Sequence, residues 1–209
     1  MFISTNALSK MIKDQYKTNL RVGYLQDGLV IIGGEWAVWM DYEYVPNKIK
    51  GTIVELAGGL PGKDKLFSLS KEYPEPQHEI VTPDIIELFS EINIADNKLN
   101  ISPIILDTYD SMRLLQTQDP LQNIVEVREK YLMLVDLSEV DLDIEGQPTG
   151  PCYAEDPYGK IYWYNDIGML YVMPSKKREN PLFSILSEVK FDDKLLVRKE
   201  QKNSEEGSN

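Results

Sequence analysis

The stretch IYWYNDIGMLYVMPSKK, residues 161–177, carries the most definite structural signal in this chain. Two runs rich in β-branched and aromatic residues, 161–164 and 169–173, flank the sequence Asn-Asp-Ile-Gly at 165–168. Because asparagine, aspartate and glycine tolerate positive φ angles, the pattern predicts a β-hairpin with a four-residue loop. Pro174 has no N–H to donate to a ladder, so we expect the second strand to end there.

The beginning of the chain predicts a helix followed by antiparallel strands. Apolar residues recur at helical spacing over 7–16, directly after the capping-type residues Ser-Thr-Asn. Further along, Asp27-Gly28 separates two apolar runs and is a strong hairpin signal. We therefore expect strands at 20–23, 29–32 and 36–44.

This opening pattern recurs later in the chain. Residues 80–86 match residues 2–8 in character: two apolar residues, a hydroxyl residue, a helix-start residue, a capping-type residue and two apolar residues. A helix is expected over 83–92, and a looser third version begins near residue 124. Recurring strand–helix–strand–strand units predict an α+β fold of repeated β-α-β-β units, with mixed or antiparallel sheets and few helices.

The repeats divide the chain into two blocks of units. The first spans 1–76 and the second 77–198, whereas 199–209 is a polar, charged tail that we expect to be disordered. Weaker patterns predict short helices over 111–117 and 129–137. They also predict strands over 48–56, 65–69, 99–105, 124–127 and 140–144.

Composition restricts the compartment and the partners. No run of about 18 apolar residues is present, no secretory signal is visible, and the single cysteine fits a reducing compartment, so we expect a cytoplasmic protein with no membrane partner. The 22 basic and 34 acidic residues give a net charge of −12. Such a chain repels nucleic acid on average, and any DNA contact requires a local basic patch.

One basic pattern stands out against this acidity. Lys10, Lys13 and Lys17 follow one another at i, i+3 and i+7, which aligns three ammonium groups along one side of the first helix. Two interpretations remain open at this point. The stripe is either an ordinary solvated helix face or a face directed at phosphates.

No catalytic, metal or cofactor motif is complete. His78 lies among prolines in an expected surface loop, and Cys152 has no cationic neighbour in sequence and is expected to pack in the interior. The segment AGGLPGKD, residues 57–64, resembles a phosphate-binding P-loop for seven positions but ends in aspartate. The acidic residues between 136 and 145 would spread along a strand instead of converging on an ion. We therefore expect a protein that is not an enzyme and holds no cofactor.

The last third of the chain resembles the closing unit of DNA polymerase sliding clamps. Three segments carry the resemblance in order: VDLDI at 140–144, PCY at 151–153 and YVMPSK at 171–176. The repeated unit is also similar to the one from which clamps are built. The resemblance implies a non-enzymatic processivity factor of DNA replication that forms a ring-shaped homo-oligomer.

The same resemblance implies roles for particular residues. In sliding clamps the corresponding C-terminal residues line a hydrophobic pocket that receives short peptides from polymerases and other replication proteins. Val172, Met173 and Pro174 would belong to that pocket. The three lysines of the first helix would face duplex DNA.

A second hypothesis starts from the acidity of the chain. The expected helix over 83–92 presents Asp84, Glu87 and Glu91, which would repel a duplex. Together with the net charge of −12, this favours an acidic interaction or inhibitor protein from a mobile element that binds a host protein.

Overall fold

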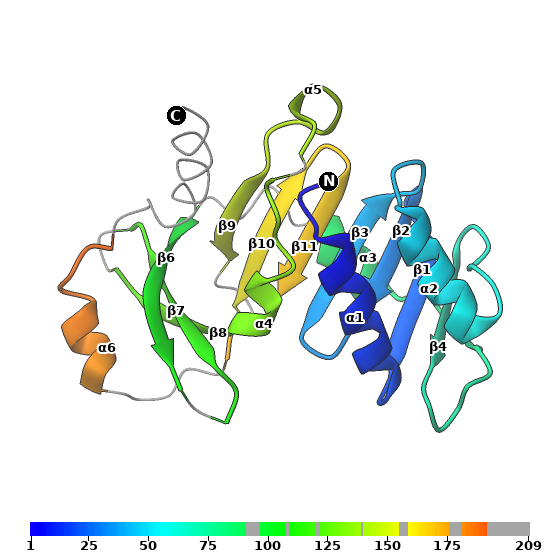
Figure 1. Ribbon diagram of the computed structural model, residues 1–209, viewed down its shortest axis with the longest axis horizontal. Helices are drawn as coiled ribbons and strands as arrows, with labels where there is room; N and C mark the ends of the chain where they lie inside the picture. The colour runs from blue at the N-terminus through cyan, green and yellow to red at the C-terminus, as the bar shows by residue number, and fades with distance from the viewer. Residues whose placement is uncertain are drawn as a thin grey trace, which may run out of the picture.

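The computed structural model describes residues 1–90, 97–107, 109–119, 122–138, 140–154, 159–175 and 181–191 (Figure 1). The helices are α1 (Thr5–Tyr16), α2 (Asn47–Ala57), α3 (Pro83–Ser90), α4 (Glu129–Leu132), α5 (Leu142–Glu145) and α6 (Pro181–Leu186). The strands of the first half are β1 (Leu20–Leu25), β2 (Gly28–Ile32), β3 (Trp36–Asp41), β4 (Lys65–Leu69) and β5 (Gln77–Glu79). Those of the second half are β6 (Asn97–Leu106), β7 (Met112–Thr117), β8 (Ile124–Arg128), β9 (Thr149–Ala154), β10 (Lys160–Asn165) and β11 (Gly168–Val172).

The fold is α+β, with a large antiparallel sheet and few helices, as the sequence predicts. Its 11 strands follow the order β5-β4-β1-β2-β3-β11-β10-β9-β6-β7-β8, so the two halves of the chain meet where β3 pairs with β11. The named strands pair only in the antiparallel sense within the described residues. Among those residues, no helix has both the length and the hydrophobicity needed to cross a membrane.

Both predicted hairpins are present. Gln26 and Asp27 have φ angles of 51° and 56° between β1 and β2, the conformation that a two-residue type I′ turn requires. β10 and β11 also form a hairpin, but Asn165 already pairs with Gly168. Its loop therefore has two residues, not the four that we predicted, and β11 ends two residues before Pro174 as expected.

The central strands bury side chains on both faces of the sheet. In β3, Trp36 and Val38 belong to the larger apolar cluster, together with residues of α1, α2 and α4, whereas Ala37 belongs to a smaller cluster with residues of α3. The face of the larger cluster, called the front face here, carries α1 and α2, and α3 lies behind the sheet (Figure 1). Burial on both sides explains why alternation is weak in the first half of this strand.

The second half of the sheet curls, so that its last strand returns toward the residues that follow β11. The Ser175 N–H donates to the carbonyl of Glu126 in β8 at 2.8 Å, and the Met173 N–H donates to the carbonyl of Glu35 at 2.8 Å. The guanidinium of Arg128, at the end of β8, is paired with the carboxylate of Glu35. These contacts tie β8 to the β2–β3 turn of the first half.

Three predicted elements are wrong. Residues 48–56 form most of α2 and not a strand, residues 112–117 form β7 and not a helix, and residues 142–145 form α5 where a strand was expected at 140–144. The predicted helix over 129–137 is reduced to α4. The predicted tail at 199–209 lies outside the described residues, and β5 extends the first half of the sheet slightly past the expected boundary at residue 76.

Each error has a physical reason. In α2 the residues Ile49, Thr52 and Ile53 are buried at i, i+3 and i+4, because the front face and α1 cover that side of the helix. β7 is hydrogen-bonded to a strand on each side, which overrides its weak helical pattern. At α5 the Asp141 carboxylate accepts from the Asp143 N–H at 3.1 Å and begins a helical turn.

Two glycines provide a first prediction. A Cβ atom at Gly28 would lie 2.2 Å from Nε1 of Trp39 and 2.8 Å from the carbonyl oxygen of Met40, so Gly28→Ala should lower the free energy of unfolding by about 1–3 kcal/mol. At Gly51, inside α2, a Cβ meets no atom within 4 Å, so Gly51→Ala should raise it by about 0.5–1 kcal/mol. Urea denaturation measures both changes, and a Gly28→Ala protein as stable as its parent would contradict the packing described here.

Candidate functional site

The front face carries a concentration of positive charge on α1 and α2. These helices lie side by side, joined by a hydrogen bond of 2.8 Å between the hydroxyls of Ser9 and Thr52 (Figure 1). Their surface forms a basic helical face, defined by the lysines at positions 10, 13, 17, 48 and 50. Asp14 and Glu55 are the only carboxylates within residues 5–17 and 47–57, so five lysines and two carboxylates leave a local net charge of +3 in these two segments.

The sequence patterns located only part of this face. Lys10 and Lys13 lie on α1 and Lys17 follows it directly, as predicted. Lys48 and Lys50 were missed, because residues 48–56 were expected to form a strand. The helical spacing of Ile49, Thr52 and Ile53 was the signal in the sequence that would have placed both lysines on a second helix, where Lys48 contacts Asn6 of α1 and Lys50 lies over Tyr42.

The ion pairs on this face are exposed and weak. Lys13 Nζ lies 2.8 Å from Glu55 Oε2, and Lys17 Nζ lies 2.7 Å from Asp14 Oδ1, but about half or more of each of these side chains is exposed. Pairs of this kind contribute little to stability and are easily exchanged for another anion. Lys10 is exposed and makes no ion pair with a residue that the structure describes. The ammonium groups of Lys10, Lys13 and Lys17 are therefore available to external phosphates.

Aromatic rings extend the basic helical face toward the sheet. The rings of Tyr24 and Tyr42 are stacked with their centroids 4.3 Å apart, and Lys50 Nζ lies 4.8 Å from the centroid of the Tyr42 ring. A cation above an aromatic ring is attracted by the negative face of the ring, which holds the Lys50 side chain along the surface.

The acidic helix α3 lies on the opposite face of the sheet. Its buried side chains Ile85 and Phe89 pack in the rear cluster, and Asp84 and Glu87 are exposed. The third predicted carboxylate, Glu91, lies outside the described residues. Because a sheet separates them from α1 and α2, the negative charges of α3 do not oppose the basic helical face directly.

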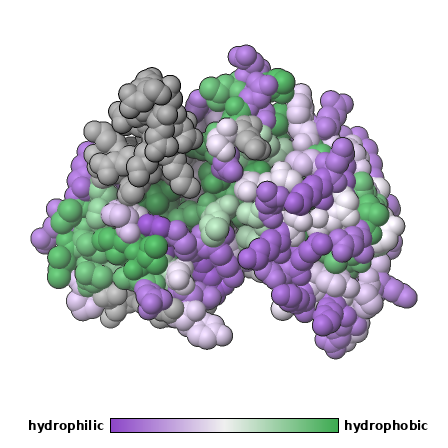
Figure 2. Space-filling model, viewed as in Figure 1, coloured by the Kyte–Doolittle hydropathy of each residue, from purple (hydrophilic) through white to green (hydrophobic). Residues whose placement is uncertain are grey.

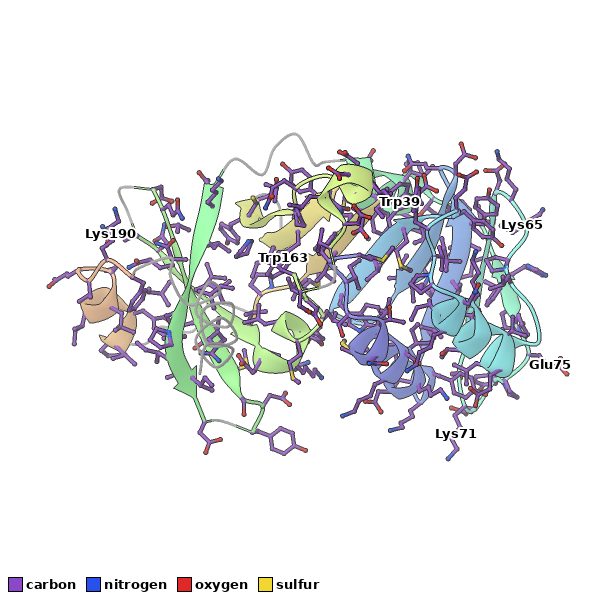
Figure 3. All side chains as sticks on the ribbon, turned by 45° about the horizontal axis from the view of Figure 1, so that its top comes forward. Trp39, Lys65, Lys71, Glu75, Trp163 and Lys190 are labelled. Atoms are coloured by element: carbon purple, nitrogen blue, oxygen red, sulfur yellow. The ribbon has the colours of Figure 1, made fainter. Side chains whose placement is uncertain are left out.

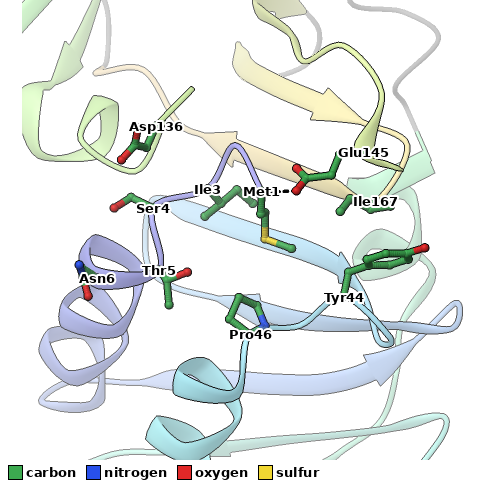
Figure 4. Close-up of a pocket in the computed structure, with 10 residues that line it drawn as sticks. All are labelled: Met1, Ile3, Ser4, Thr5, Asn6, Tyr44, Pro46, Asp136, Glu145 and Ile167. Carbon is green, nitrogen blue, oxygen red and sulfur yellow. Dashed lines mark hydrogen bonds and ion pairs between the residues drawn. The ribbon is translucent and has the colours of Figure 1, made fainter. Parts of the chain in front are cut away.

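A polar pocket of about 310 Å³ opens beside the N-terminal end of α1 (Figure 4). Ser4 and Asn6 line it from the start of this helix, and Asp136 and Glu145 add two carboxylates. The ammonium group of Met1 lies 2.5 Å from Glu145 Oε1, while Oε2 of Glu145 is buried without a hydrogen-bond partner. The pocket contains carboxylates and hydroxyls but neither histidine nor cysteine.

The residues expected to be chemically inert do not line this pocket. His78 is exposed on β5 at the edge of the sheet, and Cys152 is 2% exposed in the rear cluster, as predicted. Residues 57–64 form the end of α2 and a turn before β4, so no helix N-terminus faces the P-loop-like sequence. Within the described residues, no three potential ligand side chains gather closely enough to hold a metal ion.

The residues predicted to form a peptide pocket join the two halves of the fold. Val172 has no exposed surface and lies in the larger cluster, whereas Met173 and Pro174 are half-buried. Two main-chain hydrogen bonds, from Met173 to Glu35 and from Ser175 to Glu126, occupy the backbone of this segment. Only Met173 and Pro174 therefore retain surface that a peptide can contact.

A charged cluster surrounds Tyr131 close to this junction. The Tyr131 hydroxyl donates to the carboxylate of Glu35 at 2.9 Å, and Arg128 contacts the same carboxylate and lies 3.0 Å from Asp110. Burial raises the pKa of Tyr131 to about 12, and the hydrogen bond to Glu35 acts in the same direction while Arg128 opposes it. Tyr131 therefore stays neutral at physiological pH and holds Glu35 in place.

The raised pKa of Tyr131 predicts a loss of stability in alkali. An unfolded chain loses the tyrosine proton near pH 10, whereas the folded chain holds it to about pH 12. The contribution of Tyr131 to the free energy of unfolding is thus complete below about pH 10 and is lost as the pH rises through about 12. Urea denaturation should show a smaller alkaline loss in Tyr131→Phe than in the parent, and no difference for Tyr109→Phe, because Tyr109 is fully exposed. Equal losses in Tyr131→Phe and the parent would contradict this assignment.

No family model, curated protein or solved structure matches this chain. The side chains themselves must therefore indicate the chemistry. A group of exposed ammonium groups attracts polyanions, so the basic helical face is suited to bind phosphates.

Proposed function

We propose that this protein is a non-enzymatic binding platform of the sliding-clamp type, which contacts duplex DNA and docks peptides of replication proteins. One observation carries the proposal: the basic helical face has a local charge of +3 in a chain of net charge −12. Lysine ammonium groups that neutralise phosphates release counterions from DNA, which is the main source of sequence-independent affinity. The rest of the acidic surface would orient the molecule with this face toward the duplex.

The arrangement of elements supports the same function. Helix α1 precedes the antiparallel strands β1–β3, and α3 precedes β6–β8, so a helix followed by an antiparallel meander occurs in each half. A clamp needs its DNA-facing helices on one side of a continuous sheet, and α1 and α2 meet that requirement. Met173 and Pro174 supply the half-exposed apolar surface for peptides.

Binding to linear and circular duplexes tests the proposal. We expect affinity for linear duplex DNA to fall linearly on a log–log plot as salt rises from about 0.05 M to 0.2 M, with a slope of about −0.9 for each phosphate neutralised. A ring that encircles DNA should also remain on a closed circular duplex at a salt concentration that removes it from a linear one. Solution mass with and without DNA would give the number of subunits. A monomer with no affinity for DNA at the lowest salt would refute the proposal.

The rear face favours a second function. Helix α3 presents Asp84 and Glu87 beside Ile86, which is 39% exposed, on the side away from the basic helical face. Acidic side chains around an apolar one suit a basic protein partner, as an interaction or inhibitor protein from a mobile element would require. Affinity purification from a host lysate should then return one stoichiometric partner that is released by salt, and Asp84→Lys/Glu87→Lys should abolish its recovery. Recovery that is unchanged by these substitutions would exclude α3 as the contact.

A further inference from the structure

The C-terminal part of the described chain is bound to β6 and β7 through its main chain. Gln116 Nε2 donates to the carbonyls of Leu186 at 3.3 Å and Val189 at 2.7 Å, and Gln116 Oε1 accepts from the Phe191 N–H at 2.9 Å. Asn100 Nδ2 donates to the Phe191 carbonyl at 3.0 Å. Two carboxamides thus make four hydrogen bonds to peptide groups.

The two carboxamides are buried and held in fixed positions on neighbouring strands. Gln116 is 0% exposed and Asn100 is 3% exposed, and they are directly opposite each other in the register of β6 and β7. Gln118 Nε2 donates to Asn100 Oδ1 at 2.6 Å, which leaves the Asn100 amide nitrogen to face the segment. A buried carboxamide left without partners is costly, so this surface requires a peptide backbone or water against it.

The same face also has an apolar component. Strand alternation places Leu114 on the side of Gln116, and the register places Ile124 opposite Gln116 on β8. Leu114 is 0% exposed and Ile124 is 7% exposed. Peptide-binding grooves combine two components: polar groups that bind the peptide main chain, and apolar side chains that contact its side chains. The carboxamides and the buried aliphatic side chains of this face supply both.

The segment that occupies this face buries its apolar side chains only in part, and Phe183, Leu186 and Phe191 are the partly buried ones. Helix α6 contains no buried residue, and Leu182, Ile185 and Val189 are 37%, 61% and 51% exposed. Figure 2 shows hydrophobic surface at its lower left, the region where α6 lies in the same view in Figure 1. An element held by a few hydrogen bonds and by side chains that are only partly buried belongs to the part of a fold that opens most readily.

We propose that the outer face of β6 and β7, formed by Asn100, Leu114, Gln116 and Ile124, is a peptide-docking surface, and that residues 181–191 are its intramolecular competitor. The partner is a peptide with the same chemistry: a short apolar helical turn followed by an extended stretch with free peptide groups. Because the chain's own segment must leave first, the apparent affinity for a partner is reduced by the fraction of molecules in which the surface is open. This inference deepens the proposed function, on which it rests, since it locates a second surface for docking peptides besides Met173 and Pro174.

A labelled peptide with the sequence of residues 181–191, PLFSILSEVKF, tests the proposal on the full-length protein. Phe191→Pro removes the N–H that donates a hydrogen bond to Gln116 Oε1 and so weakens the competing segment. The affinity for the added peptide should therefore rise by roughly tenfold or more relative to the parent. Adding Gln116→Glu to Phe191→Pro replaces the donor by a carboxylate that repels the carbonyls, and should abolish binding. Lys190→Ala, an exposed position within the segment, is the matched control and should leave the affinity unchanged.

Hydrogen exchange of residues 186–190 reports whether the segment has been released. Faster exchange in Phe191→Pro, together with tighter peptide binding, supports the proposal. Faster exchange without peptide binding overturns the proposal. Exchange as slow in Phe191→Pro as in the parent also overturns it, because the contacts with Gln116 would then not be what holds the segment in place. If Phe191→Pro does not fold, saturable binding of the peptide to the parent, lost in Gln116→Glu, decides the question in its place. DNA affinity measured on the same samples separates failure of this inference from failure of the proposed function.

Discussion

Replacing Lys10 and Lys17 by glutamate should weaken binding to duplex DNA by roughly 10- to 100-fold at about 0.1 M salt. Both lysines are exposed on the basic helical face, where each would neutralise one phosphate. Losing two such contacts should reduce the slope of log affinity against log salt by about 2, and the new carboxylates add repulsion. Fluorescence anisotropy with a labelled duplex at several salt concentrations measures both effects.

The matched control reverses the same number of charges elsewhere. Lys98 and Lys190 are exposed lysines of the second half, and Lys190 lies at the opposite end of the molecule from α1 and α2 (Figure 3). The variant Lys98→Glu/Lys190→Glu has the same net charge as Lys10→Glu/Lys17→Glu, so a general effect of acidity would weaken both equally. Equal weakening would show that DNA is held by total charge and not by the basic helical face.

Trp163→Ala should lower the free energy of unfolding by about 3–5 kcal/mol. Trp163 lies in β10 with 2% of its surface exposed, and its side chain belongs to the larger apolar cluster within the molecule (Figure 3). Removing the indole leaves a cavity that the surrounding strands cannot fill, because β10 is hydrogen-bonded on both sides. Urea denaturation monitored by far-UV circular dichroism measures this change. This signal does not depend on tryptophan fluorescence, which the substitution itself alters.

Trp39→Ala is the comparison for this substitution. Trp39 is only partly buried on the rear face, and its indole N–H makes a long hydrogen bond of 3.4 Å to the Leu25 carbonyl. We expect a loss well below that of Trp163→Ala. The larger cluster also includes Trp36 of the first half, so Trp163→Ala should shift one transition for the whole chain. Two separate transitions, or equal losses for the two tryptophans, would contradict a single shared core.

The local features of this fold were predictable from short stretches of sequence. Asp27-Gly28 and residues 165–168 marked the positions of the two hairpins, although the first turn is formed by Gln26 and Asp27 and Gly28 already pairs in β2. The stripe of apolar residues after Ser4 predicted α1, and with it the positions of the three lysines along this helix. Burial of Cys152 and exposure of His78 followed from their sequence neighbours.

The chain by itself thus determined the positions of its two hairpins, its first helix and three of the five lysines of the basic helical face. Tertiary structure decided the rest. Residues 47–57 are rich in β-branched side chains and became a helix because α1 and the front face bury one side of it, which brings Lys48 beside α1 and Lys50 over the Tyr42 ring. The pairing of β3 with β11, the rear position of α3 and the contact of Gln116 with residues 186–191 join segments distant in sequence. Turn residues act through their own φ angles, whereas pairing and burial depend on which distant side chains exclude water together.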